Sequence, residues 1–318
     1  MSEAIRKRIV IKSRDQYAAL KRLGSFLDKD FPKLARLLVR TWNDQQNAIT
    51  YKELREAILR GDLTVQQWQD WQSDYAVFFN TYLRSTLINA YTAGGKELAA
   101  AILSGADVYA PGLTAVENWV VEHGGEWITR MSSEAREAVS TMVQYTTRGN
   151  ISVDELARLI RPTIGLTKPQ SEANLRYYEN MVESLKKAFM EKNPAMKEAT
   201  AERRAKKRAQ ESAIRYAARQ HRERAMMIAE TELAYAYNRG ADDAVKQAVN
   251  DGLLPRMKAK WSTAADERVC QICGGLEGTE IDLGDEFDFK GKSLFAGQKQ
   301  TPPAHPRCRC ALAYIEAE

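Results

Sequence analysis

The sequence is poor in the two residue types that most often bind transition metals. Its 318 residues include only three histidines and four cysteines. The cysteines, at positions 270, 273, 308 and 310, lie in the last fifth of the chain, and His305 lies among them. The N-terminal "MSEAIRKRIVIKSRD" has no long apolar core and no small-residue cleavage site, so we expect no signal peptide and a reducing compartment, where disulfides are rare. The clustering therefore favours a metal site.

Long apolar runs and the common catalytic motifs are also lacking. No stretch approaches the ~20 apolar residues that cross a bilayer, so we expect no membrane partner. G-x-S-x-G, the P-loop and G-x-G-x-x-G do not occur. The sequence therefore predicts a protein that is not an enzyme and has no small-molecule substrate. A zinc-stabilised nuclease, which would need a second metal or a free histidine as base, stays as an alternative.

The first 250 residues have helical periodicity, and the last 66 do not. Apolar residues recur every three or four positions, and Thr50 with Glu53 forms a capping box before a predicted helix. A helix is expected to stop or kink near Gly94–Gly95, and Gly124–Gly125 is a further interruption. One long helix is expected from residue 193 to residue 250, where Gly240 is the one helix-ending signal. Short strands are predicted at 256–262, 279–283 and 310–315. We predict a mainly α protein with a small C-terminal α+β module stapled by zinc, in three segments: 1–112, 113–251 and 252–318.

One stretch of the predicted long helix is strongly basic. Residues 186–224 contain thirteen Lys or Arg and five Glu, with little apolar face. Such a stretch suits double-stranded DNA, bound through its phosphates; a solvated helix face is the alternative. The candidate contacts are Arg203, Arg204, Lys206, Lys207, Arg208, Arg215 and Arg219. The aromatic stripe from Trp68 to Tyr82 is expected to be core.

The cysteines and His305 follow the pattern C-x2-C, then 31 residues, then H-x2-C-x-C. Structural zinc takes four nitrogen or sulfur ligands, and here five candidates compete. If residues 308–310 are extended, Cys308 and Cys310 point to opposite faces. We therefore favour Cys270, Cys273, His305 and Cys308, with Cys310 in the small core. Four cysteines without the histidine are the alternative; thiols without metal, or disulfides, are the others.

Two stretches of the C-terminal region carry a resemblance to a known family: they are "KWSTAADERVCQICGGLEGTEIDLGDEF" and "TPPAHPRCRCAL". Together they resemble the C-terminal signature of the Mu F-like head morphogenesis family of tailed phages. The helix "RAMMIAETELAYAYNRGADDA", with its Thr231–Glu232 pair, is similar to one of that family. The resemblance covers roughly residues 115–315. It implies a minor head protein inside the virion near the portal vertex, made in the host cytoplasm, with portal or major capsid protein as partner and sometimes DNA. Beside it stand two further hypotheses: a free-standing zinc-stabilised nucleic-acid-binding protein, and a contact between Glu232 and Arg268.

Overall fold

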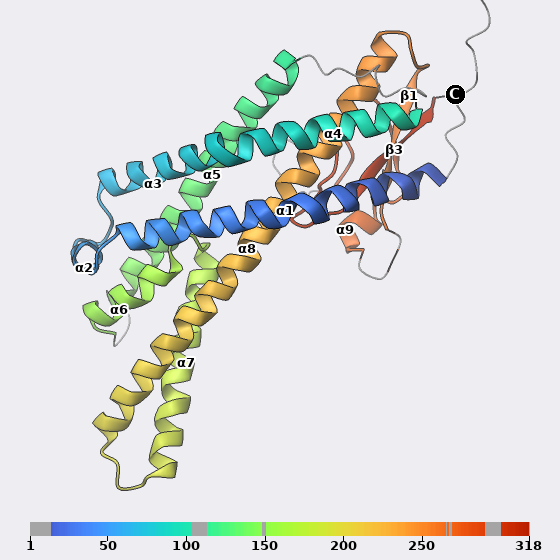
Figure 1. Cartoon of the computed structure of the whole chain (residues 1–318). Helices are drawn as coiled ribbons and strands as arrows, with labels where there is room; N and C mark the ends of the chain where they lie inside the picture. The colour runs from blue at the N-terminus through green and yellow to red at the C-terminus, as the bar shows by residue number, and fades with distance from the viewer. Residues whose placement is uncertain are drawn as a thin grey trace, which may run out of the picture. The chain divides into compact units, whose positions relative to one another are not determined.

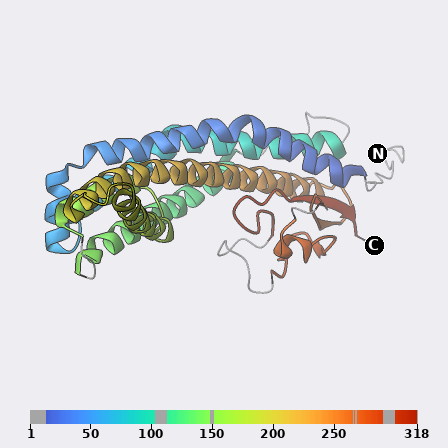
Figure 2. The same ribbon diagram turned by 90° about the horizontal axis from the view of Figure 1, so that it is seen from below.

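The computed structural model describes residues 14–102, 113–147, 151–264, 266, 269–289 and 300–317. It is mainly helical, with a small antiparallel sheet near the C-terminus (Figures 1 and 2). No helix in these ranges combines the length and apolarity that a bilayer-crossing segment needs. The elements are α1 (Arg14–Ala48), α2 (Tyr51–Arg60), α3 (Val65–Phe78), a π-helix (Phe79–Leu83), α4 (Arg84–Ile102), α5 (Leu113–Val143), a 3-10 helix (Gln144–Thr147), α6 (Val153–Ile160), a second 3-10 helix (Arg161–Thr163), α7 (Lys168–Lys192), α8 (Glu198–Asn250), β1 (Met257–Ser262), α9 (Gln271–Gly274), β2 (Glu280–Asp282) and β3 (Ala311–Glu316).

The chain divides into two compact units. The first unit comprises Met1–Leu34, Tyr82–Glu122 and Met226–Glu318, and the second comprises Ala35–Thr81 and His123–Ala225. These units group segments that are far apart in the sequence. The division into three consecutive segments, with boundaries near residues 112 and 251, stays a prediction.

Most of the aromatic stripe forms core in the second unit, as predicted, but Tyr82 at its end is exposed. Tyr75, Phe78 and Phe79 are buried and surround Trp127 of α5, with the ring of Phe78 stacked at 5.6 Å. The expected interruption at Gly124 is wrong, because α5 continues through it. A Cβ at this position would overlap the Phe79 ring, so the glycine serves close packing.

The basic half of α8 does have a buried face, made of alanine. Five alanines spaced four residues apart, from Ala201 to Ala217, are fully buried. Such small side chains let α7 approach closely, and Asn174 of α7 donates a hydrogen bond of 3.0 Å to the Ala213 carbonyl. The expectation of little apolar face is therefore wrong, because alanines repeated every four residues make a narrow buried face on the helix. The cations lie on the remaining surface of the helix.

A buried polar cluster lies beside the aromatic core of the second unit. The guanidinium of Arg224 is fully buried; it donates to the Gly165 carbonyl, pairs with Glu134 and lies over the Trp42 ring. The His221 ring also packs against Trp42, and its Nε2 lies 2.8 Å from the Ile164 carbonyl oxygen. Burial lowers the pKa of His221 to about 4, and the charge of Arg224 acts in the same direction.

The first unit contains the sheet, whose strand order is β2-β1-β3, all antiparallel. Ala259 pairs with Ile281 on one side and with Tyr314 on the other. Trp261 is fully buried and meets Phe287 edge-on at 5.1 Å. The predicted strands are confirmed, and so is the mainly α fold class with a small C-terminal sheet.

Helices α4 and α8 cross closely in the first unit, at reciprocal glycines. A Cβ on Gly94 would overlap the Tyr237 carbonyl, and one on Gly240 would overlap the Tyr91 carbonyl. Both helices continue through these positions. The expected break at Gly94–Gly95 is wrong, because the glycine is required by tertiary contact and not by a turn.

We predict that Gly94→Ala and Gly240→Ala each lower the free energy of unfolding by about 1–3 kcal/mol or more, because the clash is with rigid backbone. Gly24→Ala is the matched control, since no atom lies within 4 Å of its new methyl group. The control should be neutral or stabilise by up to about 1 kcal/mol through helix propensity. Urea unfolding measures all three, and equal effects would contradict the crossing.

We also predict an acid-sensitive contribution from His221. Its pKa is lowered in the folded state, so the unfolded chain binds the extra proton between pH 6.5 and about 4. The free energy of unfolding should therefore fall on acidification through this window, by about 3 kcal/mol from this residue. His221→Gln removes the contribution, and the difference between wild type and variant must change with pH in denaturant titrations. A constant difference would contradict the assignment.

Candidate metal centre and its anchoring to helix α8

Cys270 and Cys273 are positioned by the single helical turn that separates them. Cys270 caps α9, and the backbone N–H of Cys273 donates to its sulfur at 3.3 Å. The Gly274 N–H donates to the Cys270 carbonyl at 2.8 Å, which closes the turn. The C-x2-C spacing therefore places both sulfurs on the same side of the turn.

His305 faces both of these sulfurs through one ring nitrogen. Its Nε2 lies 3.0 Å from the Cys270 Sγ and 3.2 Å from the Cys273 Sγ. Its Nδ1 lies 2.8 Å from the Pro306 carbonyl oxygen, so we assign Nδ1 as the protonated nitrogen that donates to it. That tautomer leaves the Nε2 lone pair free, the usual arrangement of a metal-binding histidine.

Cys308 and Cys310 join the cluster from the other side of Cys273. The Sγ atoms of Cys273 and Cys308 are 3.6 Å apart, and the three sulfurs of Cys273, Cys308 and Cys310 lie within 4.8 Å of one another. The expectation that Cys310 points away from Cys308 is wrong. Residues 308–310 are not in a strand, since β3 begins at Ala311, and Arg307 has a φ of 61°. Which four donors bind stays a prediction.

The thiols of this cluster perturb one another. Hydrogen bonds from Cys273 and Cys310 lower the pKa of the Cys308 thiol well below its ordinary value. The pKa of Cys273 is raised, chiefly by its hydrogen bond to Cys308. The cluster thus favours a thiolate at Cys308, and thiolates are the form that binds metal.

The donor set fits zinc or another soft divalent ion. In a tetrahedron with Zn–S of about 2.3 Å and Zn–N of about 2.0 Å, two sulfurs are about 3.8 Å apart and a sulfur and a nitrogen about 3.5 Å. The distance of 3.6 Å between the Cys273 and Cys308 sulfurs is slightly below the sulfur–sulfur edge. The distances of 3.0 and 3.2 Å from the His305 Nε2 to the Cys270 and Cys273 sulfurs are below the sulfur–nitrogen edge. Sulfur and imidazole donors disfavour calcium and magnesium.

Buried polar side chains of α8 hold the loop that carries His305, Cys308 and Cys310. The N–H of Arg307 donates to Thr231 Oγ1 at 3.0 Å, and Asn238 Nδ2 donates to the Cys310 carbonyl at 3.2 Å. The Arg309 side chain pairs with Glu230 of α8. Glu230, Thr231 and Asn238 are each more than 90% buried. Both carbonyl and N–H groups of the loop are therefore fixed from one helix face.

Two of these three anchors were not predicted from the sequence. Thr231 was singled out only by resemblance, and Glu230 and Asn238 were not assigned to the loop. The available signal was the run of polar residues inside an otherwise apolar helix segment. The hypothesis of a contact between Glu232 and Arg268 stays open, because Arg268 lies outside the described residues; Glu232 itself is buried.

The predicted DNA contacts lie in the second unit. Six of the seven are exposed on α8: Arg203, Arg204, Lys207, Arg208, Arg215 and Arg219. Lys206 is half-buried and lies between two carboxylates, at 3.3 Å from Glu155 and 3.1 Å from Glu202. Burial lowers its pKa, but these two carboxylates outweigh the burial and raise it. Lys206 is therefore engaged within the protein.

A protein-family model described as phage Mu protein F like protein matches residues 200–313. The matched range contains most of α8, strands β1 and β2, the start of β3 and every Cys and His of the metal cluster. The comparison with curated proteins returns no match, and neither does the comparison with solved structures. The resemblance stated from the sequence is confirmed over this range.

We predict that the purified full-length protein carries one equivalent of zinc. Cys273→Ser should abolish binding, since Cys273 belongs to both donor groups. Cys310→Ser should retain the metal if Cys270, Cys273, His305 and Cys308 are the ligands. Elemental analysis gives the stoichiometry, and the visible absorption of the cobalt-substituted protein reports the number of thiolates. A wild-type protein without metal would contradict the assignment.

Proposed function

Because residues 200–313 match the phage Mu protein F like family, we propose that the protein is a structural minor head protein of a tailed bacteriophage. The family match supports a phage head-related protein. Beyond this, we propose that the protein acts in head morphogenesis at the portal vertex, inside the virion, after assembly in the host cytoplasm.

The proposal rests on one observation: the range that matches the family model contains both the Cys/His cluster and the residues of α8 that hold its loop. Residues 200–313 take in the anchors on α8 and the whole Cys/His cluster. We propose that the cluster holds zinc as a structural ion through Cys270, Cys273, His305 and Cys308. With four protein ligands, zinc has no open position for water or substrate, and we propose no catalytic step.

The partners follow from the same proposal. Portal or major capsid protein would bind the helical part of the chain, and packaged DNA would contact the basic face of α8. The exposed arginines and lysines of that face support the second contact. Their phosphate contacts would be independent of sequence and weakened by salt.

We predict that the full chain, co-expressed with the portal protein of its phage, stays associated with it through nuclease treatment and size-exclusion chromatography. Portal binding without DNA separates this proposal from its two alternatives. Elution alone, with affinity for duplex DNA that falls steeply with salt, would favour the nucleic-acid-binding protein. Cleavage of duplex DNA that stops on adding a chelator would favour the nuclease.

A further inference from the structure

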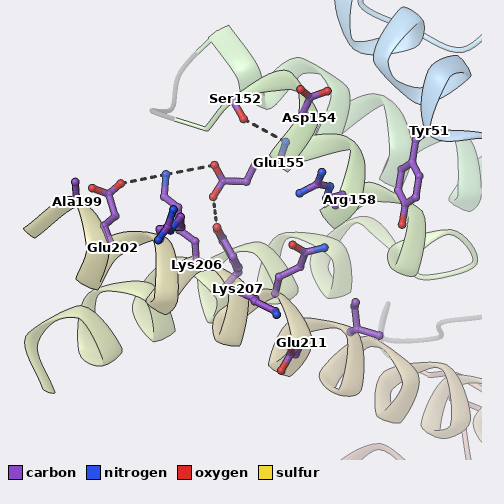
Figure 3. A pocket seen from close by; sticks show the side chains of 14 residues that line it. Tyr51, Ser152, Asp154, Glu155, Arg158, Ala199, Glu202, Lys206, Lys207 and Glu211 are labelled. Carbon is purple, nitrogen blue, oxygen red and sulfur yellow. Dashed lines mark hydrogen bonds and ion pairs between the residues drawn. The ribbon is translucent and has the colours of Figure 1, made fainter. Parts of the chain in front are cut away.

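A polar groove of about 750 Å³ lies in the second unit, where α6 and the first half of α8 face each other (Figure 3). Arg158 and Glu155 line it from α6, and Arg203 and Lys207 line it from α8. Ser152, the N-cap of α6, is also part of the wall. Four acidic and four basic side chains line the groove, so its net charge depends on which of them are already paired.

Three of the four acids in the groove form ion pairs with other side chains of the protein. Glu155 accepts a hydrogen bond from the Tyr178 hydroxyl and from Lys206, and Lys206 also pairs with Glu202 (Figure 3). Asp154 pairs with Arg55 of α2 at 2.9 Å. Glu211 is the acid of the lining left without such a partner among the described residues.

Three of the four cations in the groove form no ion pair within the described part of the chain. Arg158, Arg203 and Lys207 are exposed, and within the part of the chain that the structure describes none of the three forms an ion pair. Because Lys206 offsets the charge of only one of the two carboxylates it pairs with, these three cations oppose Glu211 and one further acid, and the groove keeps an excess of one positive charge. An anion bound there would meet guanidinium groups from both walls, and the planar guanidinium suits phosphate oxygens.

We propose that this groove binds the phosphate backbone of duplex DNA, with Arg158, Arg203 and Lys207 as its contacts. The inference rests on the proposed contact with packaged DNA and gives it a site. It adds Arg158, which lies far from the basic stretch in sequence, and it removes Lys206, which is already paired with Glu155 and Glu202.

A linear polyanion fits better than a short acidic peptide, because α8 carries further exposed cations outside the groove. Arg204, Arg208, Arg215 and Arg219 are exposed on the same helix. From Arg203 to Arg219 the helix rises about 24 Å at 1.5 Å per residue. Duplex DNA carries one charge per ~1.7 Å of its axis, so about fourteen phosphates lie along that length.

The test compares two triple variants of the full chain that remove the same charge. The groove variant is Arg158→Gln, Arg203→Gln, Lys207→Gln. The control is Arg40→Gln, Lys168→Gln, Arg176→Gln, whose cations also belong to the second unit but are each paired, with Asp44, Glu137 and Glu172. Circular dichroism and thermal unfolding confirm that both variants fold. Fluorescence anisotropy with a random-sequence duplex of about 30 base pairs gives the affinity at several salt concentrations.

Loss of three phosphate contacts should flatten the slope of log affinity against log salt by about 2.7. We expect the groove variant to show this change, with affinity reduced about tenfold or more, and the control to behave like wild type. Equal losses in both variants, or none in the groove variant, would overturn the proposal. Competition by polyglutamate as strong as that by DNA would also overturn it, in favour of an acidic protein. If wild type binds portal protein but no DNA, the groove proposal fails while the proposed head function stands.

Discussion

The pairing of buried backbone groups in the loop 305–310 is the constraint on which the C-terminal part of the structure depends. This loop has no strand or helix of its own, and Cys308 and Cys310 are buried in it. Buried N–H and carbonyl groups without partners are costly. Thr231 and Asn238 of α8 supply partners for Arg307 and Cys310. Helix α8 thereby positions the loop that carries His305, Cys308 and Cys310, and the three short strands need not do so alone.

The donor set could be predicted from sequence, but its geometry could not. C-x2-C and H-x2-C are local patterns, because a single turn decides which way both side chains point. The place of Cys310 depended on assuming an extended chain, and the φ of 61° at Arg307 precedes a bend that no spacing rule predicts. The anchors Thr231 and Asn238 lie 76 and 72 residues upstream of their partners, and only the folded chain brings them to the loop.

Glycine and alanine show the same limit in the helices. Gly94 and Gly124 were interpreted as local interruptions, yet each of them, like Gly240 in the predicted long helix, allows a neighbouring backbone or ring to approach. The basic stretch of α8 was expected to have little apolar face, yet its alanines are buried and form one. The capping box at Thr50 and Glu53 was predicted correctly, since both partners lie within one turn. A small residue can end a helix locally, or it can allow close packing between elements that are distant in sequence. The sequence does not show which of the two applies.

Two neighbouring residues of the same type can also differ in their environment, because tertiary contacts decide which of them is paired. Lys206 and Lys207 are equivalent by composition, but successive positions differ by about 100° around a helix. One therefore faces Glu155 and is neutralised, while the other is left exposed. The acids of the metal region follow a similar logic: Glu230 is occupied by Arg309. The use of Glu230 as a general base for hydrolysis would therefore remove an ion pair that holds the loop.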